Sequence, residues 1–220
     1  MFTLSATESQ ILDGMTARRP DLAGCGAKMT ELHHALVRMY DAGGKLLLCG
    51  NGGSNADAMH IAGELCKSFE RKRTLPEAFA EKLKPLPCGE DLANHLEAGL
   101  AAIALGFNGS LKTAVENDIK LRDIAFAQEA AALAKPEDVL IGISTSGNAT
   151  NCLMAMSVVK AIGGTVVSLT GPHGGKMAAF ADIAITAPGA SVKTIQEAHI
   201  VIYHTVCAMI EAHYFPEMRQ

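Results

Sequence analysis

The sequence has no excess of positive charge, and this excludes one broad class of function. Its formal net charge is -4 and its pI is about 6.1. Because nucleic-acid backbones need concentrated Lys and Arg, we expect no nucleic-acid partner. The one basic cluster comprises Lys67, Arg71, Lys72 and Arg73. We interpret it as a solvent-exposed helix C-terminus, where cations oppose the helix dipole, with steering of a phosphorylated substrate as the alternative.

The cysteines lack any CxxC spacing, so the sequence indicates neither a disulfide framework nor a zinc ribbon. We expect all of them to be reduced core residues. The opening residues MFTLSATESQ lack the positive and apolar segments of a signal peptide, and no uncharged apolar span of about 18 residues occurs. The sequence therefore predicts a cytoplasmic protein without a membrane partner.

What the sequence does contain is an alternation of short apolar runs with segments of helical periodicity. The predicted strands are Lys45–Cys49, Ala101–Leu105, Asp138–Ile143, Thr165–Leu169 and Asp182–Thr186. The predicted helices are Ser5–Arg18, Lys28–Tyr40, Glu77–Leu83, Glu90–Leu100, Ser110–Asn117, Ile119–Leu133, a segment through Val159, and Ser191–Tyr214. Such alternation predicts an α/β fold with a parallel, doubly wound sheet, whose functional loops follow the carboxyl ends of the strands.

Two segments stand apart from this alternation. Residues 1–41 form a predicted helical arm that no strand crossover needs, so we expect it to pack on the main domain, 42–220, or on another subunit. Residues 74–99 begin with a stretch that contains three prolines, which predicts an excursion or lid.

The stretch Lys45–Glu64 joins a strand, a glycine-rich turn and a helix start. Glycines let the backbone turn without Cβ clashes, and Ser54 or Asn55 is expected to cap the following helix. On that helix His60 and Glu64 stand at i and i+4, so their side chains share one face. The stretch thus predicts an anion-binding loop beside an acid/base or metal-ligating pair.

A second strand–loop–helix unit carries the loop Ser144-Thr145-Ser146-Gly147-Asn148. Hydroxyls beside a helix N-terminus can surround a phosphate, although a helix cap in a turn is the simpler interpretation of this loop alone. The sequence lacks both GxxxxGK[ST] and GxGxxG, which argues against a nucleotide P-loop and a dinucleotide site. Two such units in one chain favour a phosphorylated small molecule as the ligand.

Together, GNGGS with the following DAMH, GISTSGN, TGPHGGKM and IQEAHIVIYH resemble the sugar isomerase (SIS) family and, within it, the phosphoheptose isomerases. The resemblance implies a flavodoxin-like αβα sandwich with a five-stranded parallel sheet, a homotetramer with active sites between subunits, and a bound zinc ion. It also implies interconversion of sedoheptulose 7-phosphate and a heptose 7-phosphate.

The resemblance also implies roles for individual residues. The implied acid/base residues are Glu64 and His204. The implied zinc ligands are His60, Glu64, Gln196 and His204. The implied substrate-binding residues are Asn51, Gly52, Gly53, Ser54, Asn117, Asp118, Ser144, Thr145, Ser146 and Gln196.

The chain departs from the family pattern at three places. Ala149 replaces a serine of the phosphate loop, and Ser68 replaces a frequent arginine, for which Lys67 or Arg71 is a candidate substitute. The region 74–99 is longer than is usual. These departures keep open an isomerase of another sugar phosphate.

The chemistry leaves two further questions open. Ketose–aldose interconversion needs a base at the carbon acid and a group that moves the hydroxyl proton, roles that suit Glu64 and His204. Gln196 and His204 are separated by about 12 Å along a helix, so they converge on one ion only if both reach inward, and His199 competes with them. A non-catalytic protein that binds phosphosugars or a replication initiator is the alternative class, and the presence of both Glu64 and His204 favours an enzyme.

Overall fold

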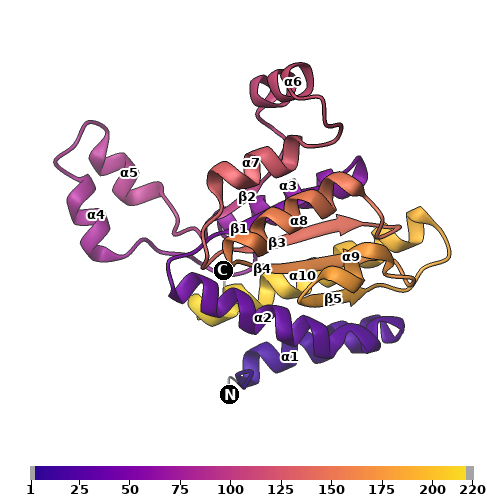
Figure 1. Ribbon diagram of the computed structural model, residues 1–220. Helices are drawn as coiled ribbons and strands as arrows, with labels where there is room; N and C mark the ends of the chain where they lie inside the picture. The colour runs from indigo at the N-terminus through magenta and orange to yellow at the C-terminus, as the bar shows by residue number, and fades with distance from the viewer. Residues whose placement is uncertain (1–2, 217–220) are drawn as a thin grey trace.

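The computed structural model describes residues 3–216 and shows a five-stranded, wholly parallel sheet with helices on both faces (Figure 1). The strands are β1 (Leu46–Gly50), β2 (Ala102–Ala104), β3 (Val139–Ser144), β4 (Thr165–Thr170) and β5 (Ile183–Thr186). Their spatial order is β2-β1-β3-β4-β5, which is the flavodoxin-like order. The predicted fold class is therefore confirmed.

Helices occupy most of the remaining described chain. They are α1 (Ala6–Arg18), the 3-10 helix η1 (Pro20–Cys25), α2 (Gly26–Asp41), α3 (Gly53–Cys66), α4 (Glu77–Leu83), α5 (Gly89–His95), α6 (Gly109–Asp118), α7 (Ala125–Leu133), α8 (Thr150–Ile162), α9 (Gly175–Phe180) and α10 (Val192–Tyr214). No helix within residues 3–216 is long and apolar enough to cross a membrane.

The central strand β1 shows why the sheet is buried on both faces. Leu46 and Leu48 belong to the core that α2, α3 and α10 cover, while Leu47 and Cys49 belong to the core under α7, α8 and α9. Successive side chains of a strand point to opposite faces, so a continuous apolar run suits a strand covered on both sides. The arm helices α1 and α2 pack on the same chain, beside α10 and β5.

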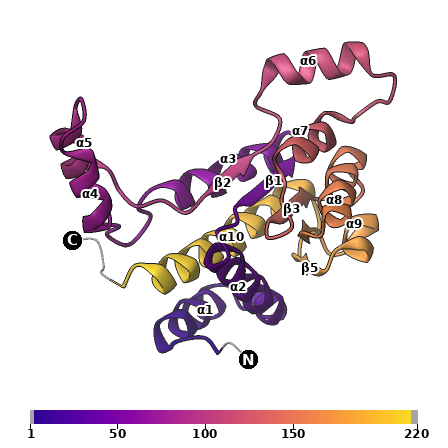
Figure 2. The same cartoon turned by 60° about the vertical axis from the view of Figure 1, so that its left-hand side comes forward.

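Two helical segments project from this body (Figures 1 and 2). The first is the α4–α5 hairpin, whose ends are joined by an antiparallel bridge between Thr74 and Glu97. The second is α6, which follows β2. The hairpin is therefore an excursion that leaves and re-enters the domain at one point, as the prolines predicted.

Some local predictions were wrong. The helix predicted over Glu90–Leu100 ends at His95, because the chain then extends to form the bridge at Glu97. The stretch before Ala125 is not helical, and Asp123 takes a positive φ of 65°. The short helix α9 was not among the predicted helices. The cysteines are free, but Cys66 and Cys88 are exposed rather than in the core.

Candidate active site

The helix α3 carries the first pair of candidate catalytic groups. His60 Nε2 lies 3.1 Å from Glu64 Oε1, as expected for side chains one turn apart. The His60 side chain is 41% exposed and that of Glu64 is 15% exposed. The pair is therefore open to a small molecule while the carboxylate is largely shielded from water.

The last helix completes this cluster from the same chain. His204 on α10 places its Nε2 atom 3.4 Å from His60 Nε2. His60, Glu64 and His204 each place one possible ligand atom within 4.8 Å of the ligand atoms of the other two. The resemblance implies active sites between subunits, whereas these three groups all come from one chain.

The surroundings of His204 favour its uncharged form. Burial lowers the pKa of this imidazole, and the neighbouring His60 lowers it further, against the opposing effect of Glu64. A neutral imidazole has one ring nitrogen that donates and one that accepts, so it can pass a proton between two oxygens.

Tyr203 and Asp57 support His60, and neither was assigned a role from the sequence. The Tyr203 hydroxyl lies 3.3 Å from Asp57 Oδ1 and 3.0 Å from His60 Nδ1. When the hydroxyl donates to Asp57, His60 Nδ1–H donates to the tyrosine oxygen and the Nε2 lone pair faces Glu64 and His204. Such supporting contacts are typical of metal-ligating histidines. The signal was present in the sequence, since Asp57 lies one turn before His60 and Tyr203 is adjacent to His204.

Gln196 lies at the other end of the α3–α10 contact. Its carboxamide packs against Gly53, where any Cβ would clash with it. Gly53 precedes His60 by about 10 Å along α3, by the helical rise. In this conformation Gln196 is placed beside the glycine-rich loop, and its role as a metal ligand stays a prediction.

The glycine-rich loop turns on Gly52 rather than on a polar cap. Gly52 is the N-cap of α3 and has a φ of 54°, so the prediction that Ser54 or Asn55 caps the helix was wrong. Ser54 is buried in the first turn. Asn51 instead exchanges two amide hydrogen bonds with Asn151 on α8, at 2.9 and 2.8 Å. These bonds tie the ends of β1 and β3 together at the point where the strand order reverses.

The hydroxyls predicted to bind phosphate follow β3 directly. Ser144 Oγ lies 3.4 Å from Ser146 Oγ, which in turn accepts a bond from Asn148 N at 3.2 Å. Gly147 has a φ of 66° and packs against the backbone of Gly174 in the next glycine-rich turn. The loop that carries Ser144, Thr145 and Ser146 is thus fixed by neighbouring backbone.

Replacement of the family serine by Ala149 has a local consequence. Ala149 is the N-cap of α8, and no side chain caps that helix start. Asn151 uses its own side chain to accept a bond from Cys152 N at 3.0 Å. The amides of Thr150 and Asn151 at the start of α8 remain available to an anion, although one hydroxyl is missing.

Asn117 and Asp118 are the last two residues of helix α6, which projects from the body of the domain (Figure 2). Both are exposed, and Asn117 Nδ2 donates to Asp118 Oδ1 at 2.9 Å. The described chain does not bring this pair to its own cluster, so a substrate contact there stays a prediction.

The interpretation of the basic cluster was wrong for two of its four members. Arg73 is fully buried and donates to Glu211 Oε1 at 2.7 Å, while Arg71 is buried and donates to Pro216 O at 2.7 Å. Arg71 is thereby engaged elsewhere and cannot replace the arginine that the family carries at Ser68. Lys67 remains a candidate, since its Nζ lies 3.4 Å from Glu64 Oε2 and its side chain is 60% exposed.

His199 does not compete with Gln196 and His204. It is fully buried, near the backbone of Thr170, and burial lowers its pKa. His213, near the end of α10, lies against Glu8 and His33.

Comparison with known proteins agrees with the fold. A model of the SIS domain matches residues 121–214. The phosphoheptose isomerase of Helicobacter pylori strain P12 is 35% identical over 207 residues, which cover 94% of this chain and 95% of the relative. The phosphoheptose isomerase of Rhodospirillum rubrum is 36% identical over 190 residues, covering 86% and 88% of the two chains.

Solved structures agree with these relatives. A phosphoheptose isomerase from Francisella tularensis has a TM-score of 0.71 at 29% identity and covers 92% of this chain and 94% of its own. The enzyme from Neisseria gonorrhoeae has a TM-score of 0.67 at 29% identity, with coverage of 93% and 91%. The fold is that of an SIS-domain protein. More narrowly, the chain belongs to the phosphoheptose isomerase family.

Proposed function

We propose that this chain is an aldose–ketose isomerase that converts sedoheptulose 7-phosphate into D-glycero-D-manno-heptose 7-phosphate. The main support from the structure is the separation of two subsites. Hydroxyls and free helix amides follow β3, while His60, Glu64 and His204 cluster about two turns into α3. A substrate with its phosphate at one end and its reacting carbons at the other needs such a division.

The reaction moves one proton from C1 to C2 and one from O1 to O2. Glu64, largely shielded from water, takes the C1 proton as the C1–C2 double bond of the enediol forms, and later returns it to C2. His204, held neutral, accepts the hydroxyl proton from O1 and delivers one to O2. No proton is gained or lost overall, so the same two groups serve both directions.

We also propose that His60, Glu64 and His204 hold zinc, with Gln196 as a fourth ligand after a side-chain movement. The donor set fits, because the Tyr203 hydroxyl orients His60 so that a lone pair faces the other two groups. When bound, zinc would supply a Lewis acid at the substrate carbonyl. Glu64 cannot be a tight ligand and a free base at once, so we assign its base role first.

A homo-oligomer, with a tetramer as the expected form, completes the proposal. Apolar side chains are exposed on the projecting segments, including Phe79 and Leu86 on the α4–α5 hairpin and Ile119 and Leu121 after α6. Projecting apolar surface of this kind is typical of interfaces. The mass of the purified protein, measured by light scattering, tests this point.

Turnover of sedoheptulose 7-phosphate by the purified protein tests the catalytic proposal. Glu64→Gln and His204→Gln should each lower kcat by about 100- to 10,000-fold, the usual contribution of general acid–base catalysis. His95→Gln, an exposed histidine on α5, is the matched control and should keep wild-type activity. A wild type that binds phosphosugars without turnover would favour the alternative class, a non-catalytic binding protein.

A further inference from the structure

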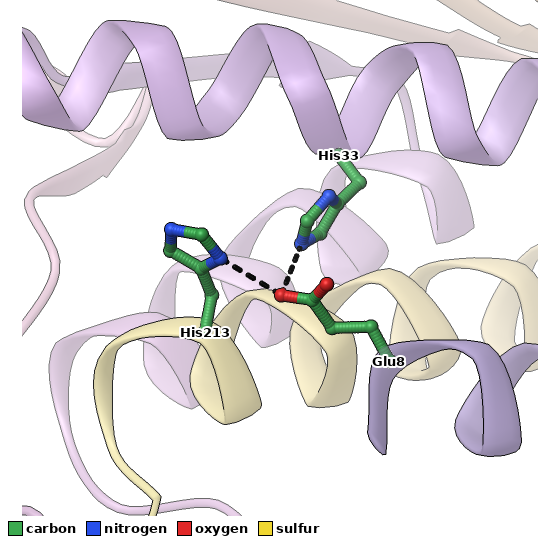
Figure 3. A group of neighbouring side chains, drawn as sticks. All are labelled: Glu8, His33 and His213. Carbon is green, nitrogen blue, oxygen red and sulfur yellow. Dashed lines mark hydrogen bonds and ion pairs between the residues drawn. The ribbon is translucent and has the colours of Figure 1, made fainter. Parts of the chain in front are cut away.

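A second group of metal-ligating side chains lies where the arm helices meet the last helix. Glu8 comes from α1, His33 from α2 and His213 from α10 (Figure 3). His213 Nδ1 is 2.8 Å and His33 Nε2 is 3.4 Å from the same oxygen, Glu8 Oε1. Two imidazole nitrogens therefore converge on one carboxylate oxygen.

These separations are close to those of ligands around one small metal ion. Zinc–nitrogen and zinc–oxygen bonds of about 2.0–2.2 Å place neighbouring ligand atoms of a tetrahedral site roughly 3.3 Å apart. The distances of 2.8 and 3.4 Å lie on either side of that value, and one ligand atom of each residue lies within 4.8 Å of the others. Small side-chain rotations are enough to place all three around one ion.

Two of the three side chains in the group are almost fully buried. The side chains of Glu8 and His33 are 3% and 2% exposed, whereas that of His213 is 33% exposed. Burial, with His213 and His34 nearby, lowers the pKa of His33 to about 4 despite the attraction of Glu8, so this imidazole is neutral at neutral pH. Its neighbours are Glu8 Oε1, 3.4 Å from Nε2, and the backbone of Met209, and neither contact has the geometry of a good hydrogen bond.

The carboxylate itself is held in its charged form. Although burial opposes it, bonds from Ser5 and His213 lower the pKa of Glu8. Ser5 N donates to Glu8 Oε2 at 2.6 Å as part of a capping box, which leaves Oε1 directed at the two histidines. A buried carboxylate oxygen that faces two imidazole nitrogens, at 2.8 and 3.4 Å, is an arrangement that a cation between the three groups would satisfy.

From this geometry we infer that Glu8, His33 and His213 form a second metal site, which takes a divalent transition metal such as Zn²⁺ and ties the N-terminal arm to α10. Two imidazoles and a carboxylate are suitable ligands for zinc, and the half-exposed edge at His213 leaves the fourth position to water. The site is structural, because it lies on the arm side of α10 and shares no residue with the His60 cluster.

Zinc titration of metal-stripped protein by calorimetry, with bound metal counted by mass spectrometry, tests this inference. The background variant His60→Gln/His204→Gln removes the first cluster and should still bind one zinc ion per chain. Addition of His33→Gln to this background should abolish that binding. His95→Gln in the same background is the control and should keep it. Zinc should also raise the Tm of the background variant and leave that of the His33→Gln combination unchanged.

A background variant that binds no zinc would overturn the inference, and so would retention of one ion after His33→Gln. Circular dichroism and gel filtration first establish that each variant is folded. If the His33→Gln combination does not fold, the His213→Gln substitution at the half-exposed edge is used in its place, and zinc binding and the zinc-dependent rise in Tm are measured on that variant. The outcome is independent of the proposed function, since turnover by the wild type is measured without reference to this site.

Discussion

The buried carboxylate of Glu211 is the most consequential single group outside the candidate site. It accepts bonds from the backbone amides of Phe69, Glu70 and Arg71 at 2.8, 2.7 and 3.0 Å, and from Arg73 Nε at 2.7 Å. Both charged side chains are fully buried. Glu211 therefore holds the segment that follows Glu64 and neutralises the arginine within it.

Substitution Glu211→Gln keeps the volume and removes the charge. The glutamine amide can accept through its one oxygen, but its NH₂ group would face the N–H groups that now donate to Glu211. Arg73 would be left as a buried cation without a countercharge. Breaking a buried pair in this way costs about 3–5 kcal/mol. The other two nitrogens of the Arg73 guanidinium group donate to the backbone carbonyls of Leu65 and Glu64. Because a displaced Arg73 would also displace Glu64, we expect a lower kcat as well.

Urea denaturation measures this loss as a lower midpoint with an unchanged slope. The matched control is Glu197→Gln on the same helix, whose side chain is 56% exposed and lies 4.0 Å from Lys193. Surface substitutions of this kind change the free energy of unfolding by less than about 0.5 kcal/mol. A loss under about 1 kcal/mol for Glu211→Gln would show that the buried-pair reasoning is wrong.

Three further predictions concern separate parts of the chain. Tyr203→Phe removes the hydroxyl that orients His60 and should weaken zinc binding by about 10- to 100-fold, measured by calorimetry; unchanged affinity would contradict the supporting role. In metal-free protein, the pKa of His33 is lowered to about 4 from an unfolded value of about 6.5, so the neutral imidazole stabilises the fold above pH 6.5. The free energy of unfolding should therefore fall by about 3 kcal/mol as the pH is lowered towards 4. The urea midpoint of the His33→Gln variant should fall less over the same pH range. Gly147→Ala places a Cβ against Gly174 at a positive φ, and should raise the KM for the phosphosugar and lower Tm; unchanged values of both would contradict a fixed phosphate loop.

The fold was largely predictable because its signals are local. Apolar runs placed every strand within about two residues, the uncertainty typical of element boundaries, and helix α4 has the predicted bounds. The failures occur where a distant partner overrides a local pattern. Leu96 and the residues after it have a helical pattern, but they extend because Glu97 pairs with Thr74.

The candidate site, like the fold, was predictable where its signals are local. His60 and Glu64 share a helix, so their spacing alone brings them together, and the motif resemblance added His204. Tyr203 could have been considered because it is adjacent to His204, but its contact with Asp57 depends on how α3 packs against α10, which the local sequence does not determine. The exposure predicted for Arg73 failed for the same reason, since its partner Glu211 lies 138 residues further along the chain.

Helix α10 links these observations into one physical picture. It supplies His204 to the candidate active site, Glu211 to the buried pair behind α3, and His213 to the contact with the arm. Successive turns of a single rigid helix thus touch the reacting groups, the segment that positions Glu64, and the arm helices. A displacement of the arm helices should therefore shift α10 and, through Glu211 and Arg73, the position of Glu64. This argues that the arm stabilises the active site.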